Sequence, residues 1–174
     1  MTTVSLQTEE KVVAELAQLG VRYLSRQSNI GTVKRRAPQE LLAALVRQPS
    51  SRVRVALIAL LLARPDYARY VPAALKRLTP PEMQTLKFFY TAAICLQKQY
   101  AETLQVFLGA QWQPLPDLFS EELGLSGEPP AARMEALARL HARQTGEGLN
   151  WAGTYENAAR HLLRRWEMEK LWDQ

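Results

Sequence analysis

Apolar residues recur every three or four positions along nearly the whole chain, which is the spacing of an amphipathic helix. No stretch alternates apolar and polar residues with a period of two, and no Asn-Gly or similar hairpin turn joins two β-branched runs. The pattern predicts an all-α fold, a bundle of about seven or eight helices, in which residues 1–174 form a single domain. Helices are expected over about 8–26, from Pro38 onward, within 129–146 and over about 154–171.

Two further helices carry most of the predicted core. Residues 55–63, "VALIALLLA", are apolar around nearly the whole helical circumference, so this helix is expected at the centre of the bundle. Thr79 and Glu82 form a capping box in "TPPE", and no Pro or Gly follows until Gly109. The longest helix is therefore predicted over 79–108. Between these two helices, Pro72 must either kink a helix or restart one.

Residues 109–130 break the helical pattern. They contain four of the ten prolines, three of the eight glycines and only acidic charges. We expect an irregular acidic connector here, with one short helix over 116–123.

The sequence also indicates a compartment. Cys95 is the only cysteine, so no disulfide can form within the chain, and its place in the 79–108 helix predicts a small buried side chain. The N-terminal "MTTVSLQTEEKVV" lacks the basic and apolar regions of a signal peptide. The strongly apolar run 55–63 has about half of the ~20 residues that a membrane-spanning helix needs. We expect a cytoplasmic protein that does not enter the membrane.

Catalytic motifs are missing from the sequence. The two histidines, His141 and His161, do not follow each other at helical spacing and have no accompanying carboxylate motif, so no metal site is predicted. The chain has no glycine-rich phosphate loop and no nucleophile elbow. We expect a protein without cofactor or catalytic activity; an enzyme with an unfamiliar type of site is the remaining alternative.

Charge gives a more specific indication. The chain carries a net charge of +5, and residues 28–54 alone contain six cations and one acid. Cations ahead of a helix N-terminus are not explained by the helix dipole, which favours negative charge there. These residues are expected to bind an acidic protein surface or, without sequence specificity, nucleic acid. The candidate binding residues are Lys34, Arg35, Arg36, Arg52 and Arg54.

Aromatic residues gather toward the end of the chain, where three of the four tryptophans follow residue 150. Tryptophan is enriched at protein interfaces. We predict Trp151 and Trp172 as interface residues. Trp166 lies at helical spacing from Tyr155 and Leu162 and is expected in the core.

Two resemblances accompany these patterns. The segment "SSRVRVALIALLLARPDYA" resembles the second-helix opening of a HEAT repeat, although no second copy follows at the expected period, so HEAT-like helical pairing is an alternative to a plain bundle. The segments "QSNIGTVKRRAPQELLAAL", "FFYTAAICLQ" and "LNWAGTYENAARHLL" resemble a family of uncharacterised small all-helical bacterial proteins. That resemblance implies association with a nucleotidyltransferase-like partner in a two-component, toxin-antitoxin-like arrangement, and it implies no catalytic residues.

Together these features favour an accessory or regulatory subunit that acts by protein–protein binding. The alternative is a non-specific nucleic-acid-binding protein that uses the basic patch at 34–54. The oligomeric state does not follow from the sequence.

Overall fold

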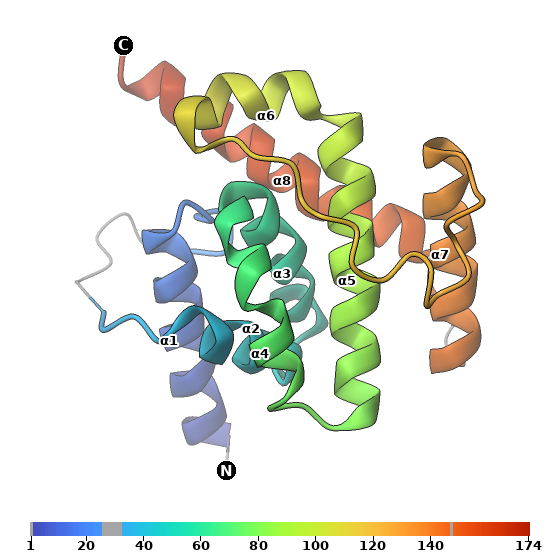
Figure 1. Cartoon of the computed structure of the whole chain (residues 1–174). Helices are drawn as coiled ribbons and strands as arrows, with labels where there is room; N and C mark the ends of the chain where they lie inside the picture. Colours follow the sequence, from blue (N-terminus) through green and yellow to red (C-terminus); the bar gives the residue numbers. More distant parts are fainter. Residues whose placement is uncertain (1, 26–32, 147) are drawn as a thin grey trace.

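The computed structural model describes residues 2–25, 33–146 and 148–174. Within these ranges the chain is all-helical and contains no strand, as the apolar spacing predicts (Figure 1). The elements are α1 (Thr2–Gln18), α2 (Pro38–Val46), α3 (Ser51–Ala63), a 3-10 helix (Pro65–Tyr70), α4 (Val71–Leu75), α5 (Pro80–Gln99), α6 (Ala101–Leu108), a 3-10 turn (Gly109–Gln111), α7 (Pro130–Thr145) and α8 (Trp151–Trp172).

Helix α3 lies at the centre of the bundle. Every residue from 55 to 63 is buried, and the helix packs against α2, α5 and α8. A side chain such as Leu60 contributes roughly 1.5–3 kcal/mol when it leaves water completely. The prediction of a central apolar helix is confirmed. Pro72 lies in the first turn of α4, where its missing N–H removes no helical hydrogen bond, so it restarts a helix and does not kink one.

The first helix is shorter than the sequence predicted. Helix α1 ends at Gln18, and Gly20 follows with φ of +101°, a conformation that favours glycine. The Gly20 carbonyl accepts a hydrogen bond of 2.8 Å from Trp166 Nε1 on α8. The predicted extension toward residue 26 is therefore wrong over 19–25, and residues 26–32 lie outside the described part of the chain.

The predicted helix 79–108 is divided in two. The capping box at Thr79 and Glu82 begins α5 as expected, but the helix ends at Gln99, and Tyr100 has non-helical dihedral angles (φ −109°, ψ 23°) before α6 begins. Figure 1 shows that α6 turns away from the α5 axis and crosses α8. The turn brings Phe107 onto Trp166, with ring centroids 5.4 Å apart. At 22 residues α8 is longer than α5, which has 20.

The acidic connector runs along α5 toward α7 without forming the helix predicted over 116–123 (Figure 1). Gln97 fixes it at two backbone groups, because Nε2 donates to the Gln113 carbonyl (2.9 Å) and Oε1 accepts from the Leu115 amide (2.8 Å). Tyr90 donates to the Pro116 carbonyl at 2.6 Å. These side-chain bonds satisfy backbone groups that a helix would otherwise satisfy.

Cys95 is buried in α5, and burial raises the pKa of its thiol. The predicted small core side chain is confirmed. Among the described residues, no helix combines the length and apolar character that crossing a bilayer requires.

Candidate interaction surfaces

The basic stretch ahead of α2 is fixed to α1. Glu15, on α1, is only 1% exposed; its Oε1 accepts a hydrogen bond of 2.7 Å from the Arg36 backbone N–H, and its Oε2 forms an ion pair with Arg36 Nε at 3.1 Å. With its amide turned to match, Gln18 pairs with both backbone groups of Val33. Residues 33–37, here called the basic segment, are therefore held along α1. The sequence offers one acid for six cations within 28–54, but Arg36 is paired all the same, because Glu15 comes from a different part of the chain.

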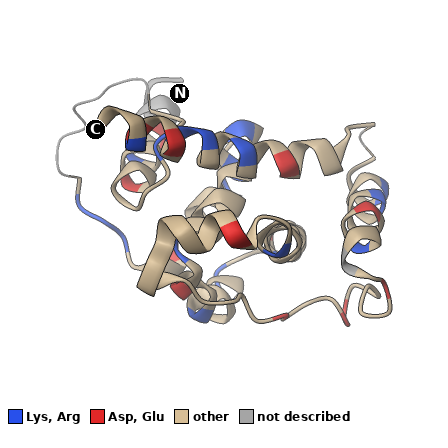
Figure 2. Cartoon of the chain, turned by 90° about the horizontal axis from the view of Figure 1, so that it is seen from above, with Lys and Arg blue, Asp and Glu red and all other residues tan. Residues whose placement is uncertain are grey.

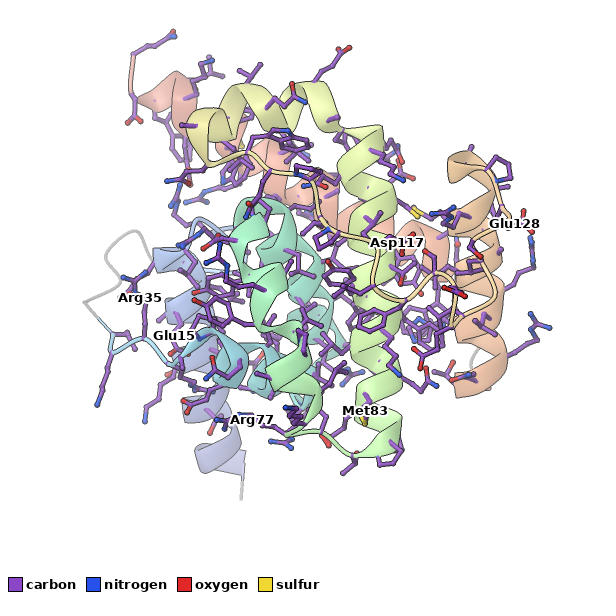
Figure 3. All side chains as sticks on the ribbon, viewed as in Figure 1. Glu15, Arg35, Arg77, Met83, Asp117 and Glu128 are labelled. Carbon is purple, nitrogen blue, oxygen red and sulfur yellow. The ribbon has the colours of Figure 1, made fainter. Side chains whose placement is uncertain are left out.

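Lys34 and Arg35 project from this fixed segment and are exposed. Figure 3 places Arg35 at the outer edge of the molecule and Glu15 inside it. The two side chains remain on the surface as the sequence predicted. Seen from above in Figure 2, positions with Lys and Arg lie beside positions with Asp and Glu on several helices.

The remaining two predicted cations, Arg54 and Arg52, differ in their contacts and exposure. Arg54 Nη1 donates to the carbonyls of Gln48 (2.7 Å) and Pro49 (2.8 Å), so this side chain satisfies the turn between α2 and α3. Arg52 is exposed at the second position of α3. It borders a groove of about 340 Å³ in which Tyr23 and His161 stack with centroids 5.4 Å apart. Of the predicted patch, Lys34, Arg35 and Arg52 are exposed cations.

Trp151 belongs to a buried aromatic cluster between α5, α7 and α8. Trp151 is 6% exposed and stacks on His141, with ring centroids 3.7 Å apart. Phe88 also stacks on the His141 imidazole, with ring centroids 4.5 Å apart. Burial raises the pKa of Tyr155, so its hydroxyl keeps its proton, and this hydroxyl shares a hydrogen bond of 2.5 Å with His141 Nδ1. Burial also lowers the pKa of His141 to about 4. Trp151 offers little surface to a partner, and the structure does not support the interface role predicted for it.

The C-terminal end of α8 exposes large apolar side chains. Trp172 is 64% exposed and Leu171 69%, and Met168, one helical turn earlier, is 39% exposed. The three positions share one helical face because they are spaced i, i+3 and i+4. We call Met168, Leu171 and Trp172 the α8 tip. Of these three residues, the sequence analysis predicted only Trp172 as an interface residue. The helical spacing of Met168 from Leu171 and Trp172 could have indicated the other two.

Ion pairs hold the helix beneath the α8 tip. Arg22 donates to both carboxylate oxygens of Glu169, at 2.7 and 2.6 Å, and Arg165 Nε donates to Glu169 Oε1 at 3.0 Å. The hydrogen bond from Arg22 is the main cause that lowers the pKa of Glu169. The Arg165 guanidinium in turn lies over the Trp172 ring, 5.5 Å from its centroid.

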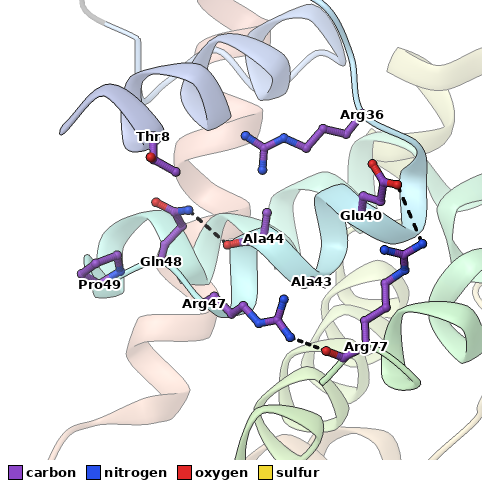
Figure 4. Close-up of a pocket in the computed structure, with 9 residues that line it drawn as sticks. All are labelled: Thr8, Arg36, Glu40, Ala43, Ala44, Arg47, Gln48, Pro49 and Arg77. Carbon is purple, nitrogen blue, oxygen red and sulfur yellow. Dashed lines mark hydrogen bonds and ion pairs between the residues drawn. The ribbon is translucent and has the colours of Figure 1, made fainter. Parts of the chain in front are cut away.

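A groove of about 490 Å³ lies between α1, α2 and the segment that follows α4 (Figure 4). Ala43 and Ala44 of α2 lie at its base, and three guanidinium groups reach it from different elements. We call it the arginine groove. The sequence did not predict it, because its arginines, Arg36, Arg47 and Arg77, are far apart along the chain.

Comparison with models of protein families, with curated proteins and with solved structures finds no match. The two resemblances noted in the sequence therefore stay predictions. Among the described residues, no three side chains of the His, Cys, Asp and Glu types gather as a metal ion would require.

Proposed function

We propose that this chain is a non-catalytic accessory or regulatory protein that binds a different protein, and that the α8 tip anchors the contact. The observation that carries the proposal is the exposure of Leu171 and Trp172, at 69% and 64%, on one helical face. Large apolar side chains, and Trp in particular, supply most of the binding energy of an interface when the partner removes them from water.

The size of the α8 tip favours a different protein over a second copy of the chain. Three such side chains expose on the order of 300 Å², whereas a stable interface buries about 800 Å² on each partner. A symmetric contact between two tips would fall well short of that area. A partner with an apolar pocket would supply the missing area around an inserted tip.

The ion pairs beneath the tip support the same proposal. Glu169 is bound by Arg22 and Arg165, and Arg165 covers one side of the Trp172 ring. These contacts restrict the helix end before any partner arrives. Binding then costs less conformational entropy than it would for a freely moving helix end.

The test compares Leu171→Glu with a matched control, Leu149→Glu, which changes another exposed leucine next to the opposite end of α8. We expect a purified companion to bind the wild type and Leu149→Glu equally in calorimetry, and to bind Leu171→Glu at least tenfold more weakly, because a carboxylate would enter an apolar pocket. A nucleotidyltransferase-like protein, which the family resemblance suggests, is the first companion to test. Affinity capture from the native cells would supply others.

Two outcomes would overturn the proposal. One is equal binding of the companion by Leu171→Glu and Leu149→Glu. The other is a dimer of the chain, measured by analytical ultracentrifugation, that only Leu171→Glu dissociates, since the tip would then serve a second copy.

Nucleic acid is a second candidate partner, and the exposed cations of the fixed basic segment favour it. Lys34 and Arg35 are held outward by the Glu15 contact. We expect gel retardation at low salt that weakens steeply as salt is added and that Lys34→Glu/Arg35→Glu abolishes. Arg36 is kept unchanged because it binds Glu15. Retardation that survives this double substitution would refute the role of the segment.

A further inference from the structure

The groove beside Arg52 lies between the start of α3, the first half of α8 and the segment that follows α1, and it has a volume of about 340 Å³. We call it the Arg52 groove. Two buried apolar side chains, Val55 of α3 and Ala158 of α8, form its base. Its polar lining consists of Tyr23, Ser51, Arg52, Thr154, Asn157 and His161. Within the described part of the chain, no Asp or Glu lines it.

The polar groups at the rim of the Arg52 groove have unused hydrogen-bonding capacity. Arg52 is exposed and belongs to no ion pair in the described ranges. Ser51, on the same helix, and Asn157, across the groove on α8, are also exposed, and neither side chain bonds another described residue. The arginine groove differs in this respect, because each of its arginines faces a glutamate. Donors thus stand on both sides of the Arg52 groove without an acceptor.

Two stacked rings form another part of the wall. The Tyr23 and His161 rings lie with centroids 5.4 Å apart at an angle of 21°, and His161 is exposed. Burial raises the pKa of Tyr23, so its hydroxyl keeps its proton and remains a donor, and the charge of Arg52 acts on this hydroxyl. The groove therefore places an aromatic wall next to a free cation.

The local field at the groove also favours an anion. Helix α3 begins there, and its first turn contains no acid, while the preceding Ser50 makes no side-chain capping bond. The positive end of the helix dipole is therefore not balanced by the chain itself, and it adds to the charge of Arg52.

We propose that the Arg52 groove binds a small phosphate monoester, with the phosphate held between Arg52 and Asn157 and the ester group over Val55. A carboxylate offers two coplanar oxygens, which a single guanidinium fork already satisfies. A phosphate monoester offers three acceptor oxygens and a charge of about −1.5 to −2. It can therefore accept from α3 and from α8 at the same time.

The base of the groove determines the second half of the ligand. Small-molecule sites have volumes of about 300–1,000 Å³ and are mainly apolar, with a few convergent polar groups. A bare phosphate ion would leave Val55, Ala158 and the exposed His161 ring uncovered. An aromatic ester group would cover them. The inference does not depend on the α8 tip, which belongs to the far end of α8.

The experiment is an NMR titration of the ¹⁵N-labelled full chain with three matched probes. Phenyl phosphate carries both halves of the ligand, methyl phosphate lacks the ring, and benzoate replaces the phosphate with a carboxylate. We expect phenyl phosphate to shift the amides of Ser51, Arg52 and His161 and to bind more tightly than either of the other probes.

Two variants of equal charge change test the cation. Arg52→Ala should weaken phenyl phosphate binding roughly fivefold or more, through the loss of one charge-assisted contact. Arg139→Ala, at an exposed position of α7 outside the groove, should bind as the wild type does. The amide spectrum of each variant also shows whether it is folded.

Each other outcome counts against the inference. Unshifted amides in the wild type would overturn it, and equal weakening by the two variants would reduce the effect to net charge. Benzoate that binds as tightly as phenyl phosphate would contradict the phosphate, and methyl phosphate that does so would contradict the ester group. An oligonucleotide without a terminal phosphate that displaces phenyl phosphate would assign the groove to nucleic acid. Leu171→Glu should leave the titration unchanged, so a failure here and a failure of the proposed function are read separately.

Discussion

Acidification should destabilise this protein through one buried residue, His141. Burial lowers its pKa from an ordinary value of 6.5 to about 4, because the aromatic cluster around it cannot solvate an imidazolium. The unfolded chain therefore binds a proton at a pH where the folded chain does not. The stability that this difference provides is complete above pH 6.5 and is lost as the pH falls toward 4.

The magnitude follows from the pKa difference. At about 1.4 kcal/mol per pKa unit, the free energy of unfolding should fall by about 2.5 kcal/mol between about pH 7.5 and about pH 4.5 through His141 alone. Protonation would also leave Nδ1 able only to donate in its hydrogen bond with the Tyr155 hydroxyl. For a bundle of marginal stability this loss is a large share of the total.

Urea unfolding followed by circular dichroism over this pH range is the assay. The same substitution at each histidine separates the contributions: His141→Gln should remove most of the pH dependence, and His161→Gln, at an exposed position, should retain it. NMR titration of the folded protein measures the imidazole directly. A His141 that titrates near 6.5 in the folded state, or a pH dependence that His141→Gln leaves undiminished, would refute the reasoning.

Three other substitutions test the structure in separate places, each by thermal or urea unfolding. Gly20→Ala should cost roughly 1–2 kcal/mol, because its φ of +101° strains any residue with a Cβ; an unchanged midpoint would contradict that conformation. Glu15→Ala should cost about 2 kcal/mol and should accelerate amide exchange at Arg36, whose N–H loses its acceptor; unaltered exchange would mean that the basic segment is held otherwise. Thr79→Ala should cost about 1 kcal/mol by removing the cap of α5, and a loss within error would show that the cap is dispensable.

The sequence predicted the helices whose ends carry their own chemical signals. Pro38 begins α2, and the Thr79 capping box begins α5. The all-apolar circumference of residues 55–63 also predicted their central place. In each case the deciding interactions are local, so a short window of sequence contains them.

Some errors in the fold arise where distant residues decide. Residues 82–108 contain no Pro or Gly, yet the helix breaks at Tyr100. The chain turns there and packs Phe107 on Trp166 of α8. Helical propensity favours continuation at Tyr100, and tertiary packing overrides it. The end of α1 is an error of another kind, because Gly20, a poor helix former that adopts a positive φ, was a local signal.

The candidate sites show the same limit. Exposure of Lys34 and Arg35 was predictable because no apolar neighbour covers them in a polar stretch. The pairing of Arg36 with Glu15 and the approach of Arg77 to Glu40 join residues 21 and 37 positions apart, which spacing cannot reveal. The sequence did contain a signal that Glu15 is buried, because this acid lies between Ala14 and Leu16 on a helix with an apolar face.

The side chains that fix the connector to α5 act over short stretches of chain: 16 to 18 residues separate Gln97 from its partners, and 26 separate Tyr90 from Pro116. Loops of this length close at modest entropic cost and favour rapid folding. The bond between Trp166 and Gly20, in contrast, spans 146 residues. During synthesis, α5 can therefore gather the connector early, whereas the side of α3 that α8 covers stays exposed until α8 has left the ribosome. The apolar helix at the centre of the finished molecule thus keeps one apolar face in water while the chain is being made.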